Sequence, residues 1–133
     1  MSLFGPPTGN TEVVKREIKS FESRIEAQKK VVTGLSSKLK ECEVKERETK
    51  LTIQVIEVAR KDFEDKNKDA AGSKQYENAL KGFDQHKNQM EKELVKMKGK
   101  CTVLRSKRQL ALNISEGMKE GLEEFKTRFN VAN

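Results

Sequence analysis

The fold of this chain is decided by residues 76–129, which read YENALKGFDQHKNQMEKELVKMKGKCTVLRSKRQLALNISEGMKEGLEEFKTRF. Apolar residues recur at alternating intervals of three and four, which is the heptad pattern of a coiled-coil helix. Written as a heptad abcdefg, the segment has apolar or aromatic residues at all of its d positions. These are Tyr76, Phe83, Met90, Met97, Leu104, Ala111, Met118 and Phe125. The pattern predicts one long helix with a single apolar seam.

The preceding segment carries the same repeat without a stutter, from Val14 at a d position to Asn67 at an a position. Between the two segments, Gly72 suits a turn and Ser73 suits the N-cap of a second helix. If the chain folds back with the turn centred between Ala71 and Gly72, every a or d position of one segment meets a d or a position of the other. Val14 then faces Phe129, Gln28 faces Ser115, and Cys42 faces Cys101. The matched phases predict an antiparallel pair of helices.

We therefore predict an all-α protein, a long antiparallel two-helix coiled-coil hairpin with the form of a rod. The expected parts are a flexible tail at 1–11, a helical hairpin at 12–129 (helix 12–68, loop 69–74, helix 75–129) and a frayed end at 130–133. The same heptads also allow two chains to exchange arms, or the hairpin to join a larger helical bundle. The pattern alone leaves that choice open.

The composition supports long helices over a globular core. The chain has 133 residues, of which 34% are hydrophobic, 5% aromatic and 37% charged, and it has no Trp. Ala, Glu, Lys, Leu and Arg make up nearly half of it, which is typical of coiled coils. The sequence shows neither a signal peptide nor an apolar run long enough to span a membrane. We expect an intracellular protein, most simply cytoplasmic, in a reducing compartment.

Catalytic and metal-binding patterns are absent from the sequence, and we expect no enzyme activity, no cofactor and no small-molecule substrate. His86 has no partner at metal-ligand or catalytic spacing. Cys42 and Cys101 are expected to pack as small hydrophobes, and whether they form a disulfide is left open.

An outer stripe of aliphatic residues is the strongest functional signal. Val44, Leu51 and Val58 recur at the f position, the outermost face of a two-helix coil, and Val55 lies beside them. Such positions usually hold Lys, Glu or Gln, so the stripe predicts a surface that docks against another helix. Val103 and Leu110, both at position c, form a second and weaker set of predicted partner-binding residues.

A basic stretch gives the alternative. Residues 87–108 hold eight Lys or Arg against two Glu, within a chain whose net charge is +7. The candidate contacts for a polyanion, such as nucleic acid or an anionic membrane, are Lys92, Lys96, Lys98, Lys100, Arg105 and Lys107. Because these residues are distributed around the helix, a solvated surface is the simpler interpretation.

Two resemblances follow from short stretches. Residues 85–90, QHKNQM, followed by Lys107-Arg108-Gln109, resemble the second helix of the flagellar and type III export stalk proteins, which are antiparallel coiled coils that act with an export ATPase. The opening residues 1–5, MSLFG, and a basic helical hairpin resemble membrane-remodelling proteins of the ESCRT-III type. Neither resemblance is carried to a family assignment.

The sequence thus predicts a non-enzymatic coiled-coil structural or adaptor subunit, which binds other helical proteins, or itself as a dimer, in a multiprotein assembly. The alternative is a membrane- or polyanion-associated scaffold that uses residues 87–108, as either resemblance would imply.

Overall fold

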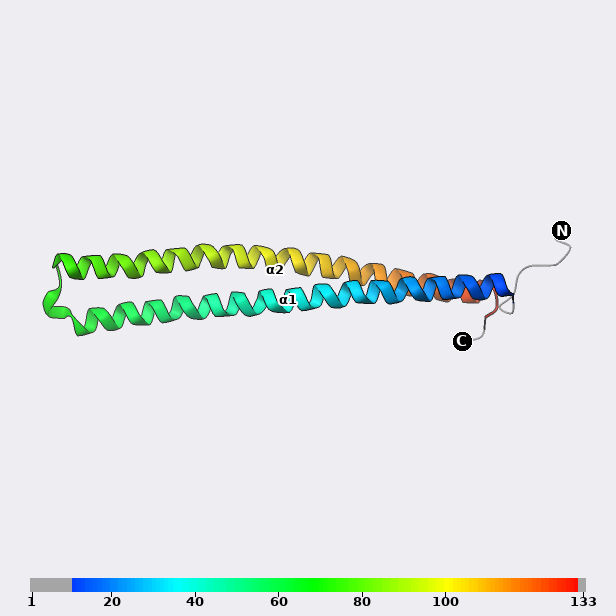
Figure 1. Ribbon diagram of the computed structural model, residues 1–133, viewed down its shortest axis with the longest axis horizontal. Coiled ribbons are helices and arrows are strands. Elements are labelled where there is room, and N and C mark those ends of the chain that lie inside the picture. The colour runs from blue at the N-terminus through cyan, green and yellow to red at the C-terminus, as the bar shows by residue number, and fades with distance from the viewer. Residues whose placement is uncertain (1–10, 132–133) are drawn as a thin grey trace. The chain divides into compact units, whose positions relative to one another are not determined.

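The chain folds into two long helices that pack antiparallel as a hairpin, as the heptad pattern predicts (Figure 1). The structure, a computed structural model, describes residues 11–131. Helix α1 spans Glu12–Lys66, a short 3-10 helix η1 spans Lys68–Ala70, and helix α2 spans Lys74–Arg128. Both long helices have 55 residues, and the described residues contain no strand.

The heptad assignment holds at every predicted seam position. All a and d residues between Val14 and Asn67, and between Tyr76 and Phe129, are buried or half-buried. The hydrophobic residues that are most fully buried all belong to this set: Val14, Ile25, Cys42, Ile56, Cys101, Ala111 and Leu122. Burial of one apolar stripe per helix therefore holds the two helices together.

The connection between the helices is built from local hydrogen bonds. Helix α1 ends at Lys66 rather than at the predicted residue 68. The Phe63 carbonyl oxygen accepts hydrogen bonds from both the backbone N–H (3.1 Å) and the side-chain amide (2.8 Å) of Asn67, and the chain then tightens into η1. Gly72 adopts a φ of 86°, in the left-handed region that glycine enters at no steric cost. Ser73 then caps α2, since its hydroxyl oxygen accepts a hydrogen bond from the Tyr76 N–H (3.2 Å).

The far end of α2 closes in a similar way. Asn130 has a φ of 53°, and its N–H donates to the Thr127 carbonyl oxygen, while the Val131 N–H donates to the Lys126 carbonyl oxygen (2.8 Å). This pair of bonds is a Schellman motif, which satisfies the last carbonyls of a helix. Of residues 130–133, which the sequence predicts to fray, 130 and 131 form this cap after the last helical residue, Arg128. Residues 132–133, like residues 1–10 of the predicted tail, lie outside the described part.

The chain divides into two compact units. The first combines residues 11–37 with 105–131. The ring centroids of Phe21 and Phe125 lie 5.4 Å apart, which anchors this unit's seam. The Gln28 amide donates to the Ala111 carbonyl oxygen (3.0 Å), one turn away from the predicted partner Ser115, which is itself buried.

The second unit is Lys38–Leu104 and contains the turn. Its aromatic cluster centres on Phe63, whose ring lies 5.5 Å from that of Tyr76 and 5.9 Å from that of Phe83. Arg60 and Lys87 occupy a positions with their apolar stems in the seam, while their charged ends reach carboxylates of the opposite helix. The polar residues of the heptad pattern are therefore accommodated at the edges of the seam.

Candidate interaction surfaces

The outer stripe, defined as Val44, Leu51, Val55 and Val58, lies on α1 in the second unit. The exposed fractions of these residues are 39%, 54%, 66% and 70%. Single exposed aliphatic residues are common on protein surfaces, but three at one heptad position in successive heptads form a continuous row. Exposed hydrophobic residues of this kind point to a partner interface.

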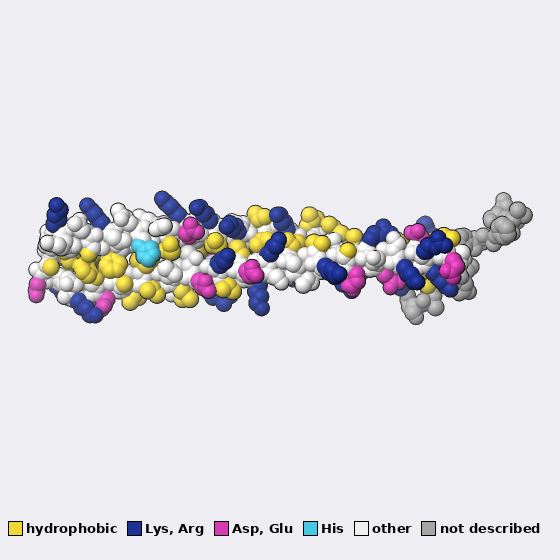
Figure 2. Space-filling view, in the orientation of Figure 1, with side chains coloured by type: hydrophobic (Ala, Val, Ile, Leu, Met, Phe, Trp, Pro, Cys, Tyr) yellow, Lys and Arg dark blue, Asp and Glu magenta, His cyan; other side chains and the backbone are white. Residues whose placement is uncertain are grey.

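The second predicted set is divided between the two units. Val103 belongs to the second unit and Leu110 to the first, and both are more than half exposed. Figure 2 shows hydrophobic side chains at the surface on the face that it presents, with Lys and Arg interspersed.

Some exposed aliphatic residues were not singled out by the sequence reasoning. Val13, Val31 and Val95 are exposed by 60%, 49% and 71%. They lie at c, g and b positions and do not repeat every seven residues, so the periodic search that finds the outer stripe passes over them.

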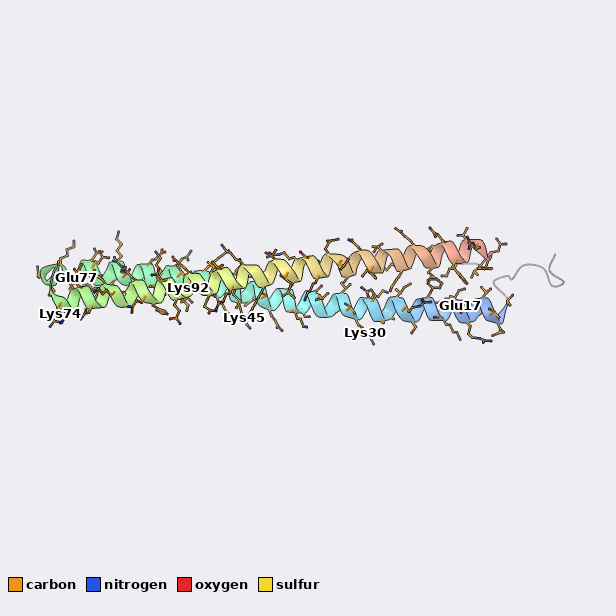
Figure 3. All side chains as sticks on the ribbon, turned by 90° about the horizontal axis from the view of Figure 1, so that it is seen from above. Glu17, Lys30, Lys45, Lys74, Glu77 and Lys92 are labelled. Atoms are coloured by element: carbon orange, nitrogen blue, oxygen red, sulfur yellow. The ribbon has the colours of Figure 1, made fainter. Side chains whose placement is uncertain are left out.

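The six predicted basic residues are all exposed. They occupy c, e, f and g positions of α2, and so they surround the helix rather than form one face. Figure 3 shows charged side chains projecting from both helices, with Lys45 on α1 and Lys92 on α2 among those labelled. Lys96 lies 3.8 Å from Glu93 on the same helix. The structure brings two of the six, Lys96 and Lys100, to the edge of one groove in the second unit.

Several ion pairs lie beside the seam near the turn. The Arg60 guanidinium donates to Asp84 across the two helices (2.9 Å) and also contacts Glu64. These hydrogen bonds, chiefly the one to Asp84, raise the pKa of Arg60, and a hydrogen bond to Asp62 raises the pKa of Lys66. Both groups are already cationic at neutral pH, so these interactions introduce no pH response near neutrality. Only the Arg60–Asp84 pair joins the two helices, since Lys66 and Asp62 both belong to α1.

The two cysteines face each other in the seam, as the fold-back register predicts. Cys101 is fully buried and Cys42 nearly so, and both are free thiols. The Cys101 thiol donates to the Cys42 sulfur with an Sγ to Sγ distance of 2.9 Å, and the Cys42 thiol donates to the Met97 carbonyl oxygen at 3.6 Å. This layer identifies the register of the second unit directly.

Within residues 11–131 no three His, Cys, Asp or Glu side chains gather as a metal site would require, and His86 is exposed. Neither helix, over the same residues, contains a stretch apolar enough to cross a membrane.

Comparisons with protein-family models, with curated proteins and with solved structures found no match to this chain. They therefore add no support to either of the two resemblances, and the surfaces described above are the basis for a functional proposal.

Proposed function

We propose that this chain is a non-enzymatic coiled-coil structural or adaptor subunit, which binds other helical proteins in a multiprotein assembly. The outer stripe is the observation that carries the proposal. A second helix laid along Val44, Leu51 and Val58 would remove their exposed surface from water. Full burial of an exposed Val or Leu contributes about 1.5–3 kcal/mol, and each of these partly exposed side chains would gain a part of that. An apolar row on a helix is also the feature that helix-in-groove and bundle partners recognise.

The test is Leu51→Glu in the tagged full chain, purified from its native cells, with mass spectrometry of the proteins that stay bound. A carboxylate in the middle of a buried stripe has no partner and is costly to desolvate, so we expect stripe-bound proteins to fall by about tenfold or more at both low and high salt. The matched control is Val95→Glu, which introduces the same charge at an exposed site of the same unit, on α2 and outside the stripe.

The proposal fails if Leu51→Glu retains every partner that the unchanged chain retains. Circular dichroism of both variants confirms that a loss reflects the surface and not the fold. Since Leu51 is exposed by 54%, we expect both variants to keep the helix content of the original chain.

The alternative proposal is a scaffold that associates with membranes or polyanions through residues 87–108. It is supported by the exposure of all six candidate basic residues. The same purification separates the two functions, because each phosphate contact neutralised by Lys or Arg makes affinity fall steeply with salt, whereas apolar docking does not. Nucleic acid or lipid bound at low salt only would favour this alternative.

A further inference from the structure

A groove of about 750 Å3 opens on the second unit between α1 and α2. The apolar residues that line it, here called its floor, are Cys42, Met97, Val103 and Leu104. Met97 and Leu104 are successive d positions that are only half-buried, and Val103 is 52% exposed, so apolar surface remains available there. The groove is not part of the outer stripe, with which it shares no residue.

Gly99 lies on the α2 side of the groove. It lines the groove in the interior of α2, and a Cβ built on it would meet no other atom within 4 Å. Its backbone is helical, a conformation that any L-residue adopts. The position can therefore accept a side chain without strain, and that side chain would project into open space beside the groove floor.

Lysines border the groove on both sides. Lys38 and Lys45 come from α1, Lys96 and Lys100 come from α2, and Glu41 is the only acidic residue that lines it. All four lysines are exposed. Among the described residues, no carboxylate lies within 4.0 Å of the ammonium groups of Lys38, Lys45 or Lys100, and only Lys96 has a neighbouring carboxylate, Glu93 at 3.8 Å. The border thus presents an excess of positive charge to whatever occupies the floor.

We propose that this groove binds one amphipathic helix of a partner protein, with its apolar residues on the floor and Asp or Glu on both flanks. The charge complementarity supports this partner: lysines on two sides would pair with carboxylates on both edges of a helix whose remaining stripe is apolar. Lys38 and Lys45 are seven residues apart, about two helical turns, which matches the spacing of flanking acidic residues along a docked helix.

A fatty acid is the other ligand with an apolar body and a negative charge. The groove favours the helix because it lies open along the surface, so an acyl chain in it would leave much of its own apolar surface in water. A helix covers the floor and keeps its polar side toward solvent. This inference rests on the proposed function because it also assumes a helical partner. The residues that carry it, however, lie outside the outer stripe.

The probe is a fluorescent synthetic helix about three heptads long, with Leu at a and d, Glu at e and g, and Ala elsewhere. Its binding to the full chain is measured by fluorescence anisotropy. Gly99→Glu places a carboxylate at the groove and should weaken binding by about tenfold or more. The matched control, Gly82→Glu, makes the same substitution on the same helix at a site that also has open space around it, and should change binding by less than about twofold.

A peptide with Lys in place of Glu should not bind the unchanged chain. The proposal is overturned if the two glycine variants bind the acidic peptide equally, since binding would then reflect net charge alone, or if the Lys peptide binds as well as the Glu peptide. It is also overturned if laurate binds, the peptide does not, and Gly99→Glu abolishes laurate binding, because the groove would then take an acyl chain.

The two proposals fail separately. Leu51→Glu should leave binding of the acidic peptide unchanged, because Leu51 does not line the groove. Loss of native partners in that variant with retained peptide binding would support both surfaces. If Leu51→Glu keeps its native partners and still binds the acidic peptide, only the proposal for the outer stripe fails.

Discussion

At the scale of single residues, the Cys42–Cys101 layer is the most specific consequence of the register. Two thiols meet in one buried layer only if the turn is centred where Gly72 and Ser73 place it. A slip of one heptad would move the two sulfurs about 10 Å apart along the helices. The layer therefore distinguishes this pairing from every neighbouring one.

We predict that diamide oxidises Cys42 and Cys101 to a disulfide within one chain. The two thiols lose two protons and two electrons, which diamide takes up as it becomes a hydrazine. The sulfurs are already 2.9 Å apart, so bond formation needs only a small adjustment, although burial of Cys101 should make the reaction slow. Intact mass spectrometry would show the loss of two hydrogens in a monomer, and Cys42→Ser would show none. Two titratable thiols after prolonged treatment would contradict the register.

At the scale of elements, the glycines separate helix from turn. Gly34 lies inside α1 with open space around it, whereas Gly72 has a φ of 86° in the connection. We predict that Gly34→Ala raises the free energy of unfolding by about 0.5–1 kcal/mol, because Ala is the better helix former. Gly72→Ala should lower it by about 1–2 kcal/mol, because an L-residue is strained at positive φ.

Thermal or urea unfolding followed by circular dichroism measures both changes. The two substitutions add the same methyl group, so their opposite signs cannot come from hydrophobicity. If both variants were stabilised, the left-handed conformation of Gly72 would not exist in solution, and the connection between α1 and α2 would need a different geometry.

The seam was predictable from the sequence because it follows from the spacing of apolar residues along the chain, which the sequence shows directly. Every a and d position, including the polar Gln28 and the charged Arg60, lies where the heptad phase predicts. The groove was not predictable in this way. It is lined by residues of both helices, Gly99 among them, and its border combines lysines far apart in the sequence. Heptad letters describe the direction of each side chain but not the space between neighbouring ones.

The helix ends also include one feature that the sequence predicted and one that it did not. Ser73 was predicted as an N-cap from its residue type and position, and its hydroxyl does accept the Tyr76 N–H. The end of α1 at Lys66 was not predicted. There the Asn67 side chain adds a second hydrogen bond to the Phe63 carbonyl oxygen, beside that of its own backbone N–H, and the chain turns into η1, an arrangement that the heptad pattern does not contain.

At the scale of the whole molecule, the sequence leaves open whether the helices pair within one chain or between two. The structure has them paired within one chain, joined by the short connection that contains η1. A short connection holds its two ends at an effective concentration of roughly millimolar. At about 1 µM protein this favours pairing within a chain by roughly a thousandfold over exchange of arms, unless the connection is strained. Gly72 relieves that strain by taking the left-handed conformation at no steric cost.

A mixture of two single-cysteine variants tests this pairing. Cys42→Ser keeps only Cys101, and Cys101→Ser keeps only Cys42, so a bond joining the original partners can form only between chains that exchange arms. We predict that oxidation of the folded mixture at about 1 µM yields monomers on a non-reducing gel, since Cys101 is fully buried against its own chain. Unfolding and refolding the mixture at about 1 mM before oxidation is the positive control, because at that concentration exchange competes with the connection. A heterodimer linked from Cys101 to Cys42 in the dilute sample would show that the arms exchange. The outer stripe and the groove would then each be present twice in one assembly.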